Sequence, residues 1–181
     1  MTKNPQEGRK LQSKKLLVDA MYQLMRKKSY TEITITELCE EAGLCRRTFY
    51  RHFQIPADVL EYAISEIANE FFIVRNTIFT REKTFHRLTV LFFYFWQDHL
   101  NVLMLFYKND LYYYFWSIFS KNLQKILSEY SSEEFTEDMI ITYLFISGGL
   151  WQLMEEWLKE GACRSPEEMG DYADTIYKMM R

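Results

Sequence analysis

Glycine and proline are scarce in this chain, because its 181 residues include only six glycines and three prolines. These two residues form many of the turns that a fold of short strands requires. Their scarcity therefore favours long helices over a β-sheet fold. We expect an all-α fold of about nine helices, over residues 10–27, 34–42, 46–52, 56–75, 82–98, 102–108, 111–129, 135–159 and 166–180, with residues 1–9 loosely ordered.

Cysteine and histidine are also rare. Cys39, Cys45 and Cys163 are odd in number and form no Cys-x-x-Cys pair, which argues against a disulfide framework or a zinc site. His86 and His99 lie 13 residues apart with no carboxylate at metal-ligand spacing. We therefore expect no metal or other cofactor. Reduced thiols are typical of the cytoplasm, where we place the protein.

Signals of export, membrane insertion and catalysis are missing as well. The N-terminus is polar and lysine-rich, without the apolar segment of a signal peptide. The longest uncharged run, residues 139–154, has 16 residues, which is short for a membrane span and predicts a buried helix instead. No Ser-His-Asp arrangement, glycine-rich phosphate loop or metal motif is evident. We expect neither an enzyme nor a membrane protein.

Hydrophobic residues are plentiful, and charge is unevenly distributed. Apolar residues make up 48% of the chain, including 31 aromatics, enough for the core of one domain or of a small domain joined to a larger one. Residues 1–53 hold 11 Lys or Arg and 6 Asp or Glu, a net charge of +5, which leaves −8 for the remainder of the total of −3. A basic first part on an acidic second part indicates a polyanionic partner for the first part alone.

The stretch from Thr34 to Phe53 has the pattern of two short helices joined by a tight turn. Thr34 and Glu37 form a capping box that opens the first helix. Gly43 ends it, because glycine tolerates a positive φ. The second helix is basic and places Phe49 and Phe53 four residues apart on its inward side. This order and spacing predict a helix-turn-helix DNA reader.

The predicted DNA contacts lie on this motif and on the preceding helix. Arg46 and Arg47 carry guanidinium groups that match guanine edges, and the Tyr50 hydroxyl suits a phosphate. Cys45 stands at a helix N-cap in a basic setting, where a thiol is either an inert substitute or redox-sensitive. The full predicted set is Lys10, Lys14, Thr34, Thr36, Cys45, Arg46, Arg47, Thr48, Tyr50, Arg51 and His52. The predicted partner is double-stranded DNA.

Residues 10–70 resemble the DNA-binding domain of the tetracycline-repressor family of bacterial transcription regulators, most closely over Thr34–Gly43 and Thr48–Phe53. The resemblance implies that Thr48 and Tyr50 contact phosphates, that Arg46 and Arg47 face base edges, and that a dimer binds a palindromic operator. Three positions depart from the family pattern: Cys45 replaces a usual Ser, Arg47 a frequent Gly, and Pro56 a usual Lys.

The resemblance divides the chain into a DNA-binding domain, residues 1–54, and an effector-binding and dimerisation domain, residues 55–181. The family's DNA-binding domain extends to about residue 70. The aromatic residues of the second part fill a core or line a pocket for an apolar or aromatic effector, and packing is the simpler reading for most of them. The candidate pocket residues are Trp96, Tyr107, Tyr112, Phe115, Trp116, Phe119 and Trp151.

The helix expected over residues 135–159 is apolar on nearly every side, so it must be covered on two sides. Gly149 would allow another helix to approach closely. We therefore expect a two-fold homodimer in which this helix and the last one pair with their copies. The candidate interface residues are Phe145, Gly149, Leu153 and Trp157.

The function predicted from sequence is that of a dimeric, effector-controlled repressor. Two other readings remain open at this point. One is an activator, or a regulator without a ligand, of the same fold. The other is a small-molecule carrier or enzyme whose DNA-binding part is vestigial, against which the retained Arg46, Arg47 and Tyr50 argue.

Overall fold

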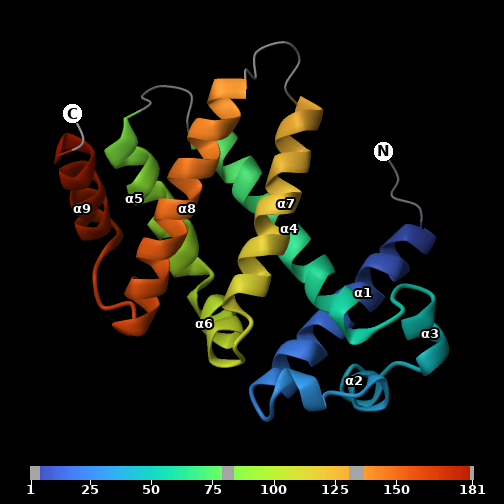
Figure 1. Ribbon diagram of the computed structural model, residues 1–181. Coiled ribbons are helices and arrows are strands. Elements are labelled where there is room, and N and C mark those ends of the chain that lie inside the picture. Colours follow the sequence, from blue (N-terminus) through green and yellow to red (C-terminus); the bar gives the residue numbers. More distant parts are fainter. Residues whose placement is uncertain (1–4, 79–83, 131–136, 180–181) are drawn as a thin grey trace.

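The computed structural model describes residues 5–78, 84–130 and 137–179, and within these ranges every regular element is a helix (Figure 1). The elements are α1 (Pro5–Met25), the 3-10 turn η1 (Tyr30–Glu32), α2 (Ile35–Glu41), α3 (Arg46–Tyr50), α4 (Pro56–Ile78), α5 (Phe85–Asp98), α6 (Leu100–Lys108), α7 (Tyr112–Tyr130), α8 (Glu137–Lys159) and α9 (Pro166–Met179). The all-α prediction is confirmed. Each helix in the described ranges is too short or too polar to cross a membrane.

Some helix ends differ from the sequence-based expectation. Helix α1 begins at Pro5 and not at residue 10, because Pro suits a first helical turn and Glu7 complements its positive end. Helix α4 continues to Ile78, past the break expected near residue 76. The starts expected at residues 82 and 135 lie outside the described residues.

Helices α1 to α3, together with η1, form a small unit that we call the head. Helix α2 packs against both α1 and α3. Leu17 and Met21 of α1, Leu38 of α2 and Phe49 of α3 are fully buried between them. The three helices therefore share one small core and expose their other faces.

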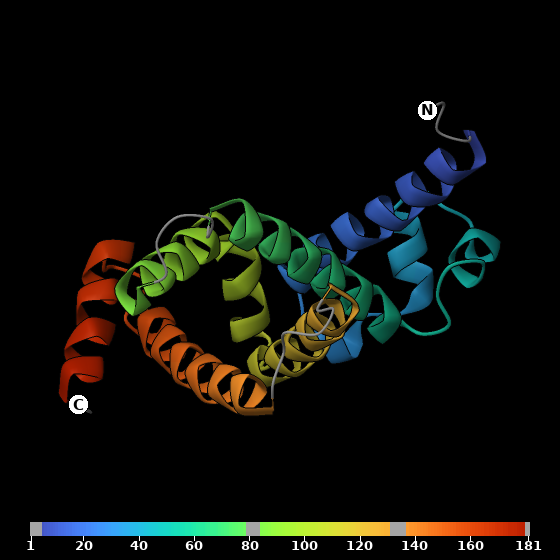
Figure 2. The same cartoon turned by 90° about the horizontal axis from the view of Figure 1, so that it is seen from above.

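Helices α4 to α9 form the larger unit, which we call the body. Helix α4 packs against α7, and α5 packs against α9. Seen from above, α4 and α5 lie on one side, α7 and α8 on the other, with α6 between them and α9 outside α5 (Figure 2). Helix α4 also packs against α1, so it belongs to the core of both units.

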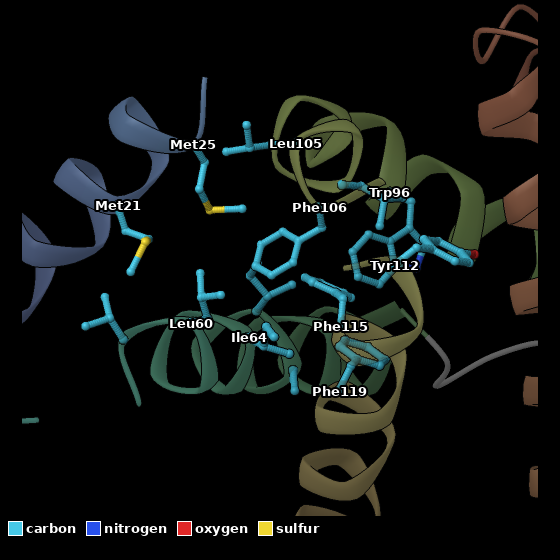
Figure 3. Packing of buried hydrophobic residues seen from close by; sticks show 14 of the residues in the cluster. Met21, Met25, Leu60, Ile64, Trp96, Leu105, Phe106, Tyr112, Phe115 and Phe119 are labelled. Carbon is cyan, nitrogen blue, oxygen red and sulfur yellow. The ribbon is translucent and has the colours of Figure 1, made fainter. Parts of the chain in front are cut away.

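One apolar core runs from the head into the body. Met21 and Met25 of α1 approach Leu60 and Ile64 of α4, and Phe106 of α6 lies on the other side (Figure 3). Farther in, Phe106, Phe115, Phe119 and Trp96 continue the cluster (Figure 3). The head is therefore attached to the body by buried side chains as well as by the chain itself.

Helix α9 opens with a capping box, and polar pairs across the contact hold it against α5. The Glu168 amide donates to the Ser165 hydroxyl over 3.2 Å, and the Ser165 amide donates to the Glu168 carboxylate over 2.7 Å. His86 of α5 lies 3.0 Å from the Asp171 carboxylate. Gly170 faces Val90 and His86 so closely that an added Cβ would overlap the Val90 Cγ2 methyl.

This close approach predicts that Gly170→Ala destabilises the protein by about 1–3 kcal/mol, because the stiff Val90 side chain must move. Thermal or denaturant unfolding measures the effect. Gly8→Ala is the matched control, since no atom lies within 4 Å of a Cβ at Gly8 and alanine favours a helix. Equal unfolding midpoints for the Gly170 variant and the wild type would contradict the prediction.

Candidate nucleic-acid interface

The outer face of α3 is basic, and its inner face carries a buried aromatic ring. Arg46, Arg47 and Tyr50 are exposed on the helix, and Arg51 follows directly after it. Phe49 is fully buried beneath them. Gly43 forms the turn before α3 with a φ of 65°, which places α3 at an angle to α2. The motif predicted from sequence is therefore formed, with its polar side chains directed outward.

Arg46 and Tyr50 contact each other along this face. The Arg46 Nη2 atom donates to the Tyr50 hydroxyl over 3.3 Å, and the guanidinium carbon lies 5.9 Å from the centre of the Tyr50 ring. Arg47 has no ion-pair partner among the described residues, and neither has Arg51. Three guanidinium groups and one phenol hydroxyl on adjacent turns can together contact phosphates and base edges.

Cys45 occupies the N-cap of α3, but its side chain makes no capping hydrogen bond to the backbone. Its Sγ atom lies 3.3 Å from the Thr48 Oγ1 atom. Hydrogen bonding to Thr48, through its side chain and then its backbone, lowers the pKa of the exposed Cys45 thiol. The half-buried Thr48 hydroxyl, predicted to contact phosphate, is therefore paired with Cys45 within the protein.

His52 lies just after the end of α3, next to its C-cap residue Arg51. Its Nε2 atom is buried and has no hydrogen-bond partner among the described residues. Burial lowers the pKa of His52, and Arg51, Lys14 and Lys10 lower it further. The three positive charges therefore all lie close enough to act on His52. Residues of α1 and the end of α3 thus contribute to one basic surface.

The predicted contacts on α1 and α2 are placed differently from one another. Lys10 is exposed, whereas the Lys14 ammonium lies 4.3 Å from the centre of the Tyr62 ring on α4. Thr36 is exposed near the start of α2. Thr34 is the N-cap of α2, where its hydroxyl accepts from the Glu37 amide over 3.2 Å and donates to the Glu37 carboxylate over 2.7 Å. Thr34 and Lys14 therefore already have partners inside the protein.

The carboxylate of Asp58, at the start of α4, occupies two backbone amides at the edge of this surface. The Asp58 Oδ2 atom accepts from the Gln54 amide over 2.6 Å and from the Ile55 amide over 3.1 Å. These amides precede Pro56, the first residue of α4. The folded turn shows that Asp58 occupies both amides.

The seven predicted pocket residues come together in the body. Trp151 of α8 lies at the centre, with the rings of Trp96, Tyr112, Phe115, Trp116 and Phe119 at centroid distances of 5.1–5.9 Å from its own. Tyr107 contacts Tyr112 at 6.0 Å, and the Tyr112 hydroxyl donates to the Trp151 carbonyl over 2.7 Å. The Trp96 Nε1 atom is buried without an acceptor among the described residues.

The four predicted interface residues do not all lie on one surface. On α8, Phe145 is 69% exposed and Gly149 is exposed, while Leu153 is half-buried. Trp157 is buried inside the subunit, where its ring contacts Phe93 and its indole N–H donates to the Arg164 carbonyl over 2.9 Å. Trp157 therefore faces the core and not a partner. The sequence reading did not include Ile141 and Leu144, which lie on the exposed side with Phe145.

Comparison with known proteins gives a likeness in fold. No protein-family model matches the sequence, and no curated protein matches it. The structure resembles that of the dihydroxyacetone kinase operon activator DhaS, with a TM-score of 0.55 and 13% identity, covering 93% of this chain and 95% of that one. It also resembles the fatty acid degradation regulator FadR from Bacillus halodurans, with a TM-score of 0.61 and 14% identity, covering 97% and 96%. Both likenesses extend over head and body together.

A salt bridge within the head predicts that the stability of the protein depends on pH. The Lys28 ammonium lies 2.6 Å from the Glu37 carboxylate, and the hydrogen bonds of Lys28 and Thr34 lower the pKa of Glu37 from 4.5 to about 2. The ionised carboxylate therefore stabilises the head above about pH 4.5, and this contribution is lost as the pH falls towards 2.

We expect Glu37→Gln to lower the melting temperature at pH 7, and the difference from wild type to shrink as the pH falls from about 4.5 towards 2. Calorimetry over this range measures the difference. Glu40→Gln is the control, because Glu40 is exposed on the same helix and has no ion pair among the described residues. A difference that stays constant with pH would exclude the proposed role of the Glu37 charge.

Proposed function

We propose that this protein is a sequence-specific DNA-binding transcription regulator that reads its operator with α3. The observation that carries the proposal is the face of Arg46, Arg47 and Tyr50 held outward on a helix whose inner residue, Phe49, is fully buried. The likeness in fold to two proteins described as transcription regulators supports it. The motif resemblance of residues 10–70 supports membership of the tetracycline-repressor family.

We further propose that the protein acts as a homodimer on a palindrome. Two copies would place their α3 helices roughly 34–36 Å apart, in successive major grooves on one side of the duplex. Arg46 and Arg47 would contact base edges, and Tyr50, Thr48 and Lys10 would contact phosphates. The acidic surface of the body would keep it away from the DNA.

An exposed apolar face on α8 and α9 supports the dimer. Ile141, Leu144 and Phe145 are exposed on α8, and Tyr172 and Ile176 are exposed on α9. Exposed apolar surfaces of this kind are typical of protein interfaces. No atom lies within 4 Å of a Cβ at Gly148 or Gly149, so a second α8 could approach the backbone there.

For the body we propose an effector site in the aromatic cluster around Trp151. The buried N–H of Trp96 has no acceptor among the described residues, and an unpaired buried donor is costly. An apolar or aromatic molecule with one hydrogen-bond acceptor would satisfy it. Binding would move α7 and α4, because Phe115 and Phe119 of the cluster lie on α7, which packs on α4.

Repression is the sign of control that we propose, through competition for the operator. Activation is the second candidate, since one of the two similar structures is described as an operon activator. A carrier or enzyme of the same fold is the third, and it predicts no selected DNA sequence.

In-vitro selection from random duplex DNA tests the proposed function. The expected result is enrichment of a palindrome, with a dissociation constant that rises steeply with salt as phosphate contacts lose their counterion contribution. Enrichment of no sequence would reject the regulator proposal in favour of the third candidate.

On the selected operator, Arg46→Ala and Arg47→Ala are each expected to reduce discrimination against single-base changes by about 1–3 kcal/mol, because each removes a base contact. Tyr50→Phe should instead weaken binding to all sequences to a similar degree. Fluorescence anisotropy with the operator and its point variants measures both. Lys121→Ala, an exposed cation on α7, serves as the control. Uniform losses across all sequences for both arginine variants would refute base reading.

For the dimer, we expect Gly149→Leu to give a monomer, because the new side chain would separate the two α8 helices. Sedimentation velocity measures the mass, and Gly8→Leu is the matched control at another open helical glycine. A dimer retained by Gly149→Leu at the concentration where wild type is dimeric would remove α8 from the interface.

A further inference from the structure

At the corner between α6 and α7, the side chain of Asn109 makes three hydrogen bonds, two of them to the head. The Asn109 Oδ1 atom accepts from the Tyr30 amide over 3.1 Å. Its Nδ2 atom donates to the Met25 carbonyl over 3.2 Å and to the Leu105 carbonyl over 2.9 Å. Met25 ends α1 and Tyr30 begins η1, so one amide group of the body satisfies two backbone groups of the head. The bond to Leu105 fixes the same amide to its own helix.

The backbone of this corner holds Asn109 in place. Asp110 has a φ of 58°, a left-handed conformation that is uncommon for a residue other than glycine. The Leu111 amide donates back to the Phe106 carbonyl over 2.9 Å, which closes the turn. Phe106 is fully buried and contacts Tyr22 of α1 at a centroid distance of 6.4 Å. The amide of Asn109 is therefore presented to the head by a turn that is itself anchored in the core.

A second polar contact lies beside the first. The Tyr114 hydroxyl of α7 donates to the Glu61 carboxylate of α4 over 3.1 Å. Burial raises the pKa of Tyr30, and the nearby Asp58 and Glu61 carboxylates raise it further. Tyr30 is thus held by its amide on one side and lies next to the α4–α7 contact on the other. The turn η1, which precedes the helix-turn-helix motif, is fixed to the body at this point.

We propose that Asn109 is the positioning residue that sets the angle of the head on the body, and thereby the spacing of half-sites that the dimer accepts. This inference rests on the proposed function. Apolar packing between α1, α4 and α6 attaches the head but has no directional preference, whereas hydrogen bonds do. The three bonds of Asn109 therefore select one orientation among those that the apolar contact allows.

The test compares two palindromes, the selected operator and the same operator with one base pair added at its centre. The added pair increases the distance between the half-sites by about 3.4 Å and rotates one relative to the other. A head held at one angle therefore binds the longer site poorly. Asn109→Ala is expected to reduce this discrimination roughly 25-fold, because about one net hydrogen bond, worth about fivefold, is lost in each of the two subunits. Asn101→Ala, an exposed asparagine on the same α6, is the matched control and should leave it unchanged.

Hydrogen exchange at the Tyr30 amide provides a second readout that needs no DNA. Asn109→Ala removes the acceptor of this amide, so its exchange should become about tenfold faster than in wild type or Asn101→Ala. Unchanged discrimination between the two palindromes, or equal losses of affinity on both, overturns the proposal. If wild type binds no palindrome, the proposed function fails, and with it the role of Asn109 in half-site spacing. Unchanged Tyr30 exchange in Asn109→Ala then also rejects the hydrogen-bonded attachment.

Discussion

Burial of Phe49 is the interaction on which the proposed DNA-reading surface depends. Helix α3 has five residues, far fewer than an isolated helix needs to be stable in water. Its conformation is therefore imposed by tertiary contacts, chiefly the fully buried Phe49 and the nearby Phe53. Because these two rings face inward, Arg46, Arg47 and Tyr50 must face outward.

The same apolar core gives the head its place on the body. Leu17 and Met21 of α1 are fully buried, and α1 packs against α2 of the head and against α4 and α6 of the body. A three-helix unit alone buries little surface, so sharing α4 with the body adds to its stability. Any movement of α4 or of the α6–α7 corner is therefore transmitted to α3 through packed side chains. Asn109 adds direction to this attachment.

Polar groups of the interface are mostly paired within the protein, and this affects how it would meet DNA. Thr34 closes a capping box, Thr48 contacts Cys45, and Lys14 lies over Tyr62. A phosphate contact by any of them would replace an existing partner. Its net contribution to binding would be only the difference in free energy between the phosphate contact and the contact within the protein. Arg47, Arg51 and Lys10 are exposed, so their charges are available to phosphates and bases at lower cost.

The sequence by itself determined the helical class, the capping box at Thr34, the turn at Gly43 and the inward side of α3, because these depend on neighbours within a few residues. Only the tertiary structure decided that Trp157 faces the core and that Asn109 reaches Tyr30. Asn109 and Tyr30 are 79 residues apart, and helical periodicity carries no information about which distant elements meet. Trp157 lies on a helix that is apolar on both sides in the sequence. Which side is buried is therefore determined by how the other helices pack against it.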